Sequence, residues 1–492
     1  MTGYGLLIGG EQVPAASGAT FEALNPTTGR PWATHAEAGA EDVDRAVRAA
    51  QAAFDGEAWR SLSPTRRGRL MMRWADLIGE HAEEIARIEV ADNGKLYKEM
   101  LAQLRVIPEW LYYFGGLADK VEGRVIPLDR PDVLNYTLRE PLGVVGVIVP
   151  WNSPVLLTMY TLAPAVAAGN AVVVKPSEHA SASVLETLLL ASEAGFPPGI
   201  LNVVTGAGDT GRALVEHPGV AKVSFTGSEE TGKRIAAAAG SRLAPVALEL
   251  GGKSPNIVFP DAALDAAEAG ILAGIFAASG QTCVAGSRAL LHRAVYDELL
   301  DRLERRAGSI VLGDPMADET QMGPIANPPQ LERVERMVAA AREEGGRVVH
   351  GGGRAALAEH PEGLFYEPTI VADVDNAATI AQDEVFGPVL TVLPFESEDE
   401  AVAIGNDTRF GLAAGVWTRD VKRAHRVASR LRAGTVWVNL YRAITFNSPF
   451  GGFKESGFGR VNGAEAIEGY LQTKSVWVEL AEGVQDPFVM KV

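Results

Sequence analysis

The sequence predicts an α/β protein with two stacked, doubly wound α/β domains and a small β domain. Three observations carry this prediction. The chain has 492 residues, which exceeds the length at which one hydrophobic core keeps growing. Short apolar runs rich in Val and Ile alternate with segments whose apolar residues recur every three or four positions. The connections are short, and the alternation begins again after Gly252.

The first unit opens with helix-period segments at residues 43–56 and Arg69–Asn93. From residue 142 onward, buried strands alternate with helices, which predicts a parallel sheet with helices on both faces. The predicted strands are Leu142–Val149, Ala171–Lys175, Leu201–Val204 and Lys222–Phe225, and the predicted helices are Ala182–Glu193, Thr210–Glu216 and Glu229–Ala239.

The second unit repeats this order and predicts another α/β domain, with a cleft between the two where ligand sites tend to form. Its predicted strands are Asn256–Phe259, Ala289–His292, Thr369–Val371, Val389–Pro394, Gly415–Trp417 and Thr435–Val438. Its predicted helices are Leu264–Ser279, Tyr296–Ala307 and Leu331–Gly345.

A third, smaller part is predicted from Arg124–Glu140, whose alternating apolar residues indicate a hairpin. With a closing strand at Ser475–Leu480 it would form a separate sheet suited to self-association. The predicted division is therefore 1–120 with 142–251 for cofactor binding, 252–450 for catalysis, and 121–141 with 470–492 for oligomerisation.

Composition narrows the class of protein. The formal charge of −17 argues against a nucleic-acid or anionic-membrane partner. No apolar run is long enough to span a bilayer, no export signal is visible, and one cysteine fits a reducing cytoplasm. We expect no metal site, since the histidines lie singly and the calcium-loop frame at Asp373 lacks its glycine at Ala378.

Cys283 is the only cysteine of the chain. It has no partner for a disulfide and no cysteine cluster to hold a metal, so it is either a packed thiol or a nucleophile. Two other residues offer complementary chemistry. Glu249, between two leucines at a predicted strand end, is either a general base with a raised pKa or the partner of a lysine such as Lys253. Asn152, between Trp151 and Ser153, is either an oxyanion donor or a turn residue.

Several motifs, in order along residues 25–475, together resemble the aldehyde dehydrogenase superfamily. Besides the contexts of Glu249 and Cys283, they are Trp151-Asn152, Lys175-Pro176-Ser177-Glu178, Phe225-Thr226-Gly227-Ser228, Glu384-Val385-Phe386-Gly387-Pro388 and Ser448-Pro449-Phe450-Gly451-Gly452. The resemblance implies a Rossmann-like cofactor domain, a catalytic domain, and assembly into dimers or tetramers.

The resemblance also implies a mechanism. The Cys283 thiolate attacks the aldehyde, and the Asn152 amide and the Cys283 backbone N–H hold the oxyanion. Loss of hydride to the nicotinamide leaves a thioester, which water activated by Glu249 hydrolyses to a carboxylic acid. A CoA-acylating enzyme, which typically lacks the base, and a non-catalytic structural member are the alternatives.

For the cofactor, the resemblance implies a site without the usual glycine fingerprint, so Gly206–Gly211 is interpreted as a tight turn. Ser228 would meet the pyrophosphate at a helix N-terminus, although it equally suits a plain N-cap. Glu178 favours NAD over NADP, because a 2′-phosphate would face a like charge, although Lys175 could tolerate NADP. The candidate cofactor residues are Val149, Trp151, Lys175, Ser177, Glu178, Gly208, Phe225, Gly227, Ser228, Glu384 and Phe386.

The substrate tunnel is expected to be apolar. Ser153 replaces a frequent aromatic residue of the family, and Ala277 stands where the succinate-semialdehyde branch has an arginine, although Arg442 could still reach an anion. We therefore expect a bulky apolar or aromatic aldehyde, with a semialdehyde as the alternative. The candidate substrate residues are Ser153, Tyr160, Phe276, Ile444 and Phe446.

Overall fold

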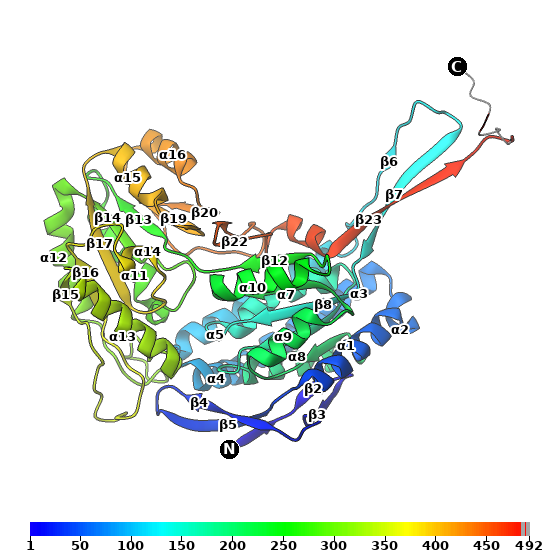
Figure 1. The fold of residues 1–492 in the computed structure, drawn as a ribbon, viewed down its shortest axis with the longest axis horizontal. Coiled ribbons are helices and arrows are strands. Elements are labelled where there is room, and N and C mark those ends of the chain that lie inside the picture. Colours follow the sequence, from blue (N-terminus) through cyan, green and yellow to red (C-terminus); the bar gives the residue numbers. More distant parts are fainter. Residues whose placement is uncertain (484–487, 489–492) are drawn as a thin grey trace.

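The computed structural model describes residues 1–483 and 488. Two large sheets lie side by side with helices around each, and a narrow antiparallel arm projects from one end (Figure 1). This arrangement confirms the predicted α/β class. In the described part of the chain, no helix combines the length and the apolar character needed to cross a membrane.

The first large sheet has eight strands in the order β22-β12-β11-β8-β9-β10-β2-β3. Its centre is parallel, and each residue of β8 and β9 is buried, because helices cover both faces. Its strands are β2 (Leu6–Ile8), β3 (Glu11–Val13), β8 (Val144–Val149), β9 (Ala171–Pro176), β10 (Leu201–Val203), β11 (Val220–Thr226), β12 (Val246–Glu249) and β22 (Gly457–Phe458). Its helices include α1 (Ala40–Asp55), α7 (Pro154–Ala167), α8 (Ala182–Glu193), α9 (Gly208–Glu216) and α10 (Glu229–Gly240).

The second large sheet has seven strands in the order β15-β16-β17-β14-β13-β19-β20. Alternate residues of β13 point to opposite faces, so Ile257 packs with α13, α15 and α16, and Val258 with α11 and α12. The strands are β13 (Pro255–Val258), β14 (Arg288–His292), β15 (Arg347–His350), β16 (Thr369–Ala372), β17 (Val389–Phe395), β19 (Ala413–Trp417) and β20 (Thr435–Val438). The helices are α11 (Leu264–Ile275), α12 (Tyr296–Ala307), α13 (Pro328–Glu343), α14 (Thr379–Gln382), α15 (Glu398–Asn406) and α16 (Val421–Arg430).

The N-terminal third contains elements that the sequence did not predict. β1 (Thr2–Tyr4), β4 (Thr20–Asn25) and β5 (Arg30–Ala36) form a sheet of their own. The predicted helix Arg69–Asn93 is two helices, α3 (Pro64–Glu80) and α4 (Ala82–Asn93), because the backbone leaves the helical region at His81. Three further helices in this region are α2 (Glu57–Arg60), α5 (Tyr97–Val106) and α6 (Pro108–Leu117).

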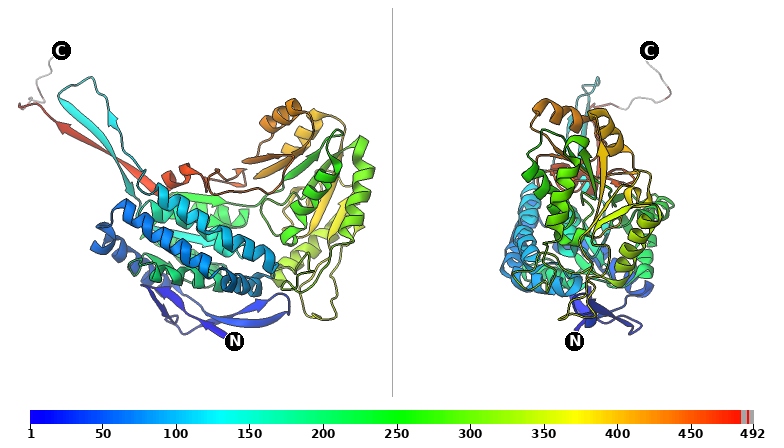
Figure 2. Two further views of the ribbon diagram at one scale, coloured as in Figure 1. Left: turned by 180° about the vertical axis from the view of Figure 1, so that it is seen from behind. Right: turned by 90° about the vertical axis from the view of Figure 1, so that its left-hand side faces the viewer.

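The projecting arm is a three-stranded antiparallel sheet in the order β23-β7-β6 (Figure 2). The predicted hairpin forms β6 (Val125–Ile126) and β7 (Val133–Pro141). The closing strand is longer than predicted, because β23 (Leu471–Glu479) pairs along the whole of β7. Residues 484–487 and 489–492 of the predicted oligomerisation part lie outside the described residues.

Two short strands and a 3-10 helix complete the chain before the arm. β18 (Phe410–Gly411) pairs with β21 (Phe453–Lys454), and a 3-10 helix spans Ala464–Tyr470. Residues 451–469, which the predicted division left unassigned, also supply β22 at the edge of the first sheet. The C-terminal segment therefore returns to the first large sheet before it enters the arm.

Candidate active site

Cys283 lies in a loop after α11, and this loop begins earlier in the chain than the sequence analysis predicted. The predicted helix Leu264–Ser279 is wrong at its end, since α11 stops at Ile275. Ala278, Ser279 and Gly280 then adopt left-handed backbone, with φ of 54°, 53° and 69°. Such conformations strain residues other than glycine, and they turn the chain away from the helix axis.

Contacts from several elements fix the loop around Cys283. A Cβ atom on Gly280 would overlap the carbonyl oxygen of Gly387, so the loop passes too close to its neighbour for a larger residue. The Gln281 side chain accepts from the Ala326 N–H at 2.9 Å. On the other side, Tyr441 donates its hydroxyl proton to the carbonyl of Val284 at 3.0 Å. The nucleophile candidate is therefore held by backbone geometry and by contacts distant in sequence.

Asn152 reaches this loop from the first sheet. It follows β8, its side chain is buried, and its Nδ2 donates to the backbone carbonyl of Gln281 at 2.9 Å. An amide nitrogen carries two N–H groups, and this bond uses one of them. The structure thus brings the predicted oxyanion donor to within two residues of Cys283.

Glu249 ends β12, the neighbour of β11 in the first sheet. Its carboxylate is buried, and Oε2 has no hydrogen-bond partner. Burial raises the pKa of Glu249 well above its usual value, although Arg460 acts in the opposite direction. The alternative partner Lys253 is itself buried, and among the described residues the two form no ion pair. The surroundings of Glu249 suit a group that must accept a proton near neutral pH.

The Cys283 side chain is partly exposed, but its sulfur lies in low-dielectric surroundings. Burial raises the pKa of the thiol to about 12, and the charges of Glu384 and Glu249 act in the same direction. Burial likewise raises the pKa of Glu384, to about 7. The resting site therefore favours a neutral thiol, and attack on a carbonyl requires removal of its proton.

Glu384 and Phe386 lie between the two large sheets, in the loop after α14. Glu384 accepts the Gly252 N–H at 2.9 Å, and Arg333 donates to the Glu384 carbonyl at 2.6 Å. The Phe386 ring meets Trp151 edge to face, with 5.3 Å between the ring centroids. The contact between Phe386 and Trp151 therefore places a predicted cofactor residue of the second unit against the first unit, and Glu384 is held within the second unit.

The other predicted cofactor residues gather at the carboxyl ends of the parallel strands, where ligands bind in doubly wound sheets. Val149 ends β8, and Lys175 near the end of β9 forms an ion pair of 3.5 Å with Glu178. Burial opposes ionisation of Glu178, but Lys175 holds the pKa of that carboxyl below its usual value. Ser177 also donates to Glu178, at 3.3 Å.

Residues Phe225–Ser228 connect β11 to α10. Ser228 caps this helix, since its hydroxyl accepts the Thr231 N–H. Gly227 lies so close to the Phe225 ring that a Cβ atom would overlap it. The first N–H groups of a helix that its cap does not engage, together with a glycine before the cap, suit the close approach of a phosphate. Gly208, by contrast, begins α9 with open space around it.

The predicted substrate residues fall into two groups. Tyr160 stacks on Trp110 with 5.2 Å between the ring centroids, and Phe446 meets Trp110 edge to face at 5.9 Å. Ile444 packs beside the same core, whereas Phe276 is buried in a hydrophobic cluster of the second unit. The structure therefore brings Tyr160, Phe446 and Ile444 to one core, and Phe276 to another.

Ser153 is bound by a residue that the sequence analysis missed. Its hydroxyl accepts a hydrogen bond of 2.9 Å from the ammonium of Lys95, and both side chains are buried. A lysine after Asn93-Gly94 is typical of an exposed turn, so no sequence signal points to this contact. Trp110, which joins Tyr160 to Phe446, was missed for a similar reason, since its spacing suits an ordinary core residue.

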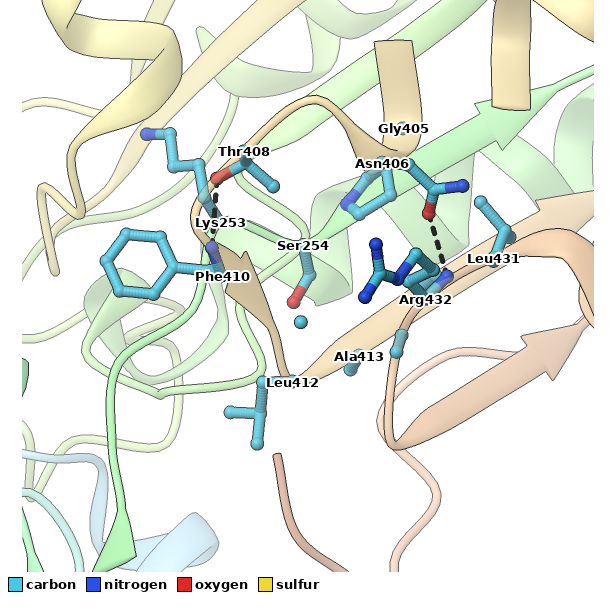
Figure 3. A pocket seen from close by; sticks show the side chains of 14 residues that line it. Lys253, Ser254, Gly405, Asn406, Thr408, Phe410, Leu412, Ala413, Leu431 and Arg432 are labelled. Atoms are coloured by element: carbon cyan, nitrogen blue, oxygen red, sulfur yellow. Dashed lines mark hydrogen bonds between the residues drawn. The ribbon is translucent and has the colours of Figure 1, made fainter. Parts of the chain in front are cut away.

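Figure 3 shows a small cavity whose lining residues include Lys253. It has a volume of about 10 Å³, which is about the space for one water molecule. Ser254, Thr408 and Arg432 are among its lining residues, and it does not reach Cys283. Within residues 1–483 and 488, no group of three or more His, Cys, Asp or Glu side chains could hold a metal ion.

Comparison with known proteins agrees with this architecture. Residues 13–476 match the model of the aldehyde dehydrogenase family. The chain is 45% identical over 482 residues to the aldehyde dehydrogenase of Aspergillus niger, covering 98% of this chain and 96% of that protein. It is 43% identical over 473 residues to the betaine aldehyde dehydrogenase of Bacillus subtilis, covering 96% of each chain.

Solved structures give the same result. The betaine aldehyde dehydrogenase of Staphylococcus aureus in complex with NAD⁺ superposes with a TM-score of 0.97 at 38% identity, over 99% of this chain and 97% of that one. The NAD⁺ complex of the Bacillus cereus aldehyde dehydrogenase gives 0.95 at 43% identity, over 97% of both chains. This chain belongs to the aldehyde dehydrogenase family. It is an enzyme of that family.

Proposed function

We propose that the enzyme oxidises an aldehyde to a carboxylic acid through a covalent adduct on Cys283. The observation that carries the proposal is the convergence of three elements. The Asn152 amide contacts the loop of Cys283 at Gln281, and the unpartnered carboxylate of Glu249 is close enough to raise the pKa of the thiol. A nucleophile, an oxyanion donor and a base are the groups that acyl transfer requires.

The steps follow from these groups. Sulfur of Cys283 adds to the aldehyde carbon, and the thiol proton leaves through a base. The thiohemiacetal oxyanion accepts from Asn152 Nδ2 and from the Cys283 N–H. Bound NAD would supply the acceptor for the hydride of the thiohemiacetal carbon, which leaves a thioester on Cys283. Glu249 then takes a proton from water as that water attacks the thioester, the C–S bond breaks, the acid departs, and Cys283 is restored as a free thiol.

The residues around the strand ends suit NAD. Lys175 is buried and Glu178 is half-exposed, so their pair presents a carboxylate to which vicinal ribose hydroxyls can donate. A 2′-phosphate would bring like charge to Glu178, which supports NAD over NADP. Trp151 and Phe386 would flank the cofactor, and Glu384 would hold the nicotinamide ribose.

For the substrate, the aromatic cluster of Trp110, Tyr160 and Phe446 supports a bulky apolar or aromatic aldehyde. A semialdehyde remains the alternative, with Arg442 as its partner. Aromatic faces also attract quaternary ammonium groups, so betaine aldehyde, after which one relative is named, belongs among the test substrates.

The test is an aldehyde panel with NAD or NADP, each with and without coenzyme A, followed by the absorbance of the reduced nucleotide. We expect NAD-dependent turnover that is independent of coenzyme A and fastest with an apolar or aromatic aldehyde. Turnover that required coenzyme A would overturn hydrolysis of the thioester. No turnover on any aldehyde would favour a structural member of the family.

We also propose that the enzyme is a cytoplasmic homodimer or homotetramer, with domains 1–120 plus 142–251, 252–450, and 121–141 plus 470–492. Apolar side chains on the arm support assembly, since Val125 is 72% exposed, Trp477 is 62% exposed and Leu138 is 42% exposed. The acidic chain with a single cysteine supports a reducing compartment. A monomeric mass at micromolar concentration in light scattering would contradict the assembly.

A further inference from the structure

The turn between α4 and α5 is buried, although its residues are typical of a surface turn. Asn93 and Lys95 are 1% and 2% exposed. Gly94 has φ of +71°, and a Cβ atom there would lie 2.6 Å from Pro324 and 2.8 Å from Pro26, so only glycine fits. The Asn93 side chain accepts the Lys95 N–H at 3.0 Å, which fixes the direction of the lysine.

This turn holds the residues on both sides of Asn152. Asn93 Nδ2 donates to the Trp151 carbonyl at 3.4 Å, and Lys95 Nζ donates to the Ser153 hydroxyl at 2.9 Å. Asn152 itself donates from its side chain to the Gln281 carbonyl. The α4–α5 turn thus holds the backbone on both sides of Asn152, and this backbone sets the direction of the Asn152 amide.

The same turn and the helix after it also contact the nucleophile loop. Glu99 in α5 accepts the Ala278 N–H at 3.3 Å, within the left-handed stretch before Cys283. Gly94 packs against Gly323, whose carbonyl accepts the Ser279 hydroxyl at 2.8 Å. The α4–α5 turn and the start of α5 therefore contact both the segment that carries Asn152, which follows the first large sheet, and the loop that carries Cys283, which belongs to the second unit.

Charged groups surround the Lys95 ammonium. Burial lowers the pKa of Lys95 to about 8, and Arg442 on the loop after β20 acts in the same direction, whereas Glu99 on α5, Glu89 on α4 and the sulfur of Cys283 act against it. A buried lysine is costly unless it is paired, and Glu89 and Glu99 each keep one buried oxygen without a hydrogen bond. A positive charge in this place opposes the effect of Glu384 and Glu249 on the thiol.

We propose that Lys95 is a positioning residue, which anchors the Trp151–Ser153 segment through the Ser153 hydroxyl and supplies a positive charge beside Cys283. The inference rests on the proposed roles of Asn152 and Cys283. Beyond those roles, the α4–α5 turn would align the oxyanion donor Asn152 with the nucleophile Cys283.

Three variants of the full-length enzyme test the inference: Lys95→Met, Ser153→Ala and Lys222→Met. Lys222 is the matched control, because it is also a buried lysine with a hydrogen bond, to the Gly469 carbonyl, but has no charged partner near Cys283. Steady-state kinetics give kcat and KM, and iodoacetamide alkylation of the single cysteine, followed by intact mass, reports the thiolate without any substrate.

We expect Lys95→Met to lower kcat by about 10- to 100-fold with a change in aldehyde KM below about threefold, and to slow alkylation at a fixed pH several-fold. Ser153→Ala keeps the charge, so it should lower kcat by about three- to tenfold and leave alkylation unchanged. Lys222→Met should change neither readout, and its folding is compared by thermal unfolding.

The outcomes separate the two proposals. Alkylation of Lys95→Met at the wild-type rate, or a kcat within about twofold of wild type, would overturn the role of Lys95. A Ser153→Ala effect on KM alone would make Ser153 a wall of the tunnel and overturn the anchoring step. A wild-type enzyme without aldehyde turnover would refute the proposed function, whereas alkylation would still measure the effect of Lys95 on the thiol.

Discussion

The two sides of the active site are built from different kinds of backbone. On the nucleophile side, Ala278, Ser279 and Gly280 are left-handed in succession, and the loop touches neighbours far away in sequence. On the cofactor side, the candidate residues of the first sheet stand at ordinary strand ends and at a helix start that Ser228 caps, whereas Phe386, in the loop after α14, is also left-handed. The nucleophile therefore follows strained backbone, whereas most of the candidate cofactor residues lie on regular βα connections.

Substitutions on the two kinds of backbone should therefore have different effects on turnover and on binding. A strained loop is held only by its surroundings, so a small change there displaces the reacting atom. A strand end is fixed by the sheet, so a change of side chain alters affinity or specificity and leaves the backbone in place.

Removal of the nucleophile should abolish turnover and leave NAD binding unchanged. Cys283→Ala should lower turnover at least about 1,000-fold, because no other thiol can replace it. NAD should still raise the melting temperature of the variant, since the strand ends are unchanged. Turnover near the wild-type rate would refute the nucleophile assignment, and loss of NAD stabilisation would show that the two sides are not separate.

Glu249→Gln should separate the two halves of the reaction. We expect a rapid burst of NADH of about one equivalent per site, followed by steady turnover about 100-fold slower, because the base acts on the thioester. Stopped-flow absorbance measures both phases. Because burial raises the pKa of Glu249, wild-type deacylation should become faster as the pH rises through that pKa, and the variant should lose this dependence. Steady rates within a few-fold of wild type would contradict the assignment.

The backbone difference itself can be tested with a pair of glycines. Gly280→Ala forces an alanine into left-handed backbone and against Gly387, so it should destabilise the protein by about 1–3 kcal/mol and lower kcat by about tenfold or more. Gly208→Ala enters open space at the start of α9, so its effect on stability should stay within about 0.5 kcal/mol.

Denaturant unfolding gives both free energies. Equal losses of stability in the two variants would show that the nucleophile loop is no more constrained than the cofactor side. A rise in KM for NAD in Gly208→Ala, with unchanged stability, would support Gly208 as a cofactor contact.

The regular elements could be predicted from the sequence because their signals are local. β8 and β9 are short apolar runs, and α12 follows the helix period closely. The N-terminal strands could not be predicted, since β1 has three residues and is defined by its pairing with β5, about 30 positions later. The break in the helix before Cys283 was missed because alanine and serine suit a helix and only tertiary contacts impose the left-handed turn.

In the candidate site, too, residue types could be predicted from the sequence, whereas tertiary contacts could not. Cys283, Glu249 and Asn152 were selected by residue type and by family resemblance, and their roles remain predictions. The structure adds what local sequence does not encode: the contact of Asn152 with Gln281, and the two cores that separate Phe276 from Tyr160. The Lys95–Ser153 bond joins residues 58 positions apart and has no motif of its own.

The smallest expected effect lies on the cofactor side. Glu178→Gln keeps the size of the side chain and removes its charge, so the ion pair with Lys175 is lost and the ammonium becomes available to a phosphate. The ratio of kcat/KM for NADP to that for NAD should therefore rise about tenfold, with kcat for NAD within about threefold of wild type. Glu230→Gln is the matched control, because Glu230 lies in the first turn of α10 and pairs with Arg234 on the surface. An unchanged ratio in Glu178→Gln would show that this carboxylate does not face the adenosine ribose, and a fall in kcat as large as that of Glu249→Gln would remove the distinction between the two sides.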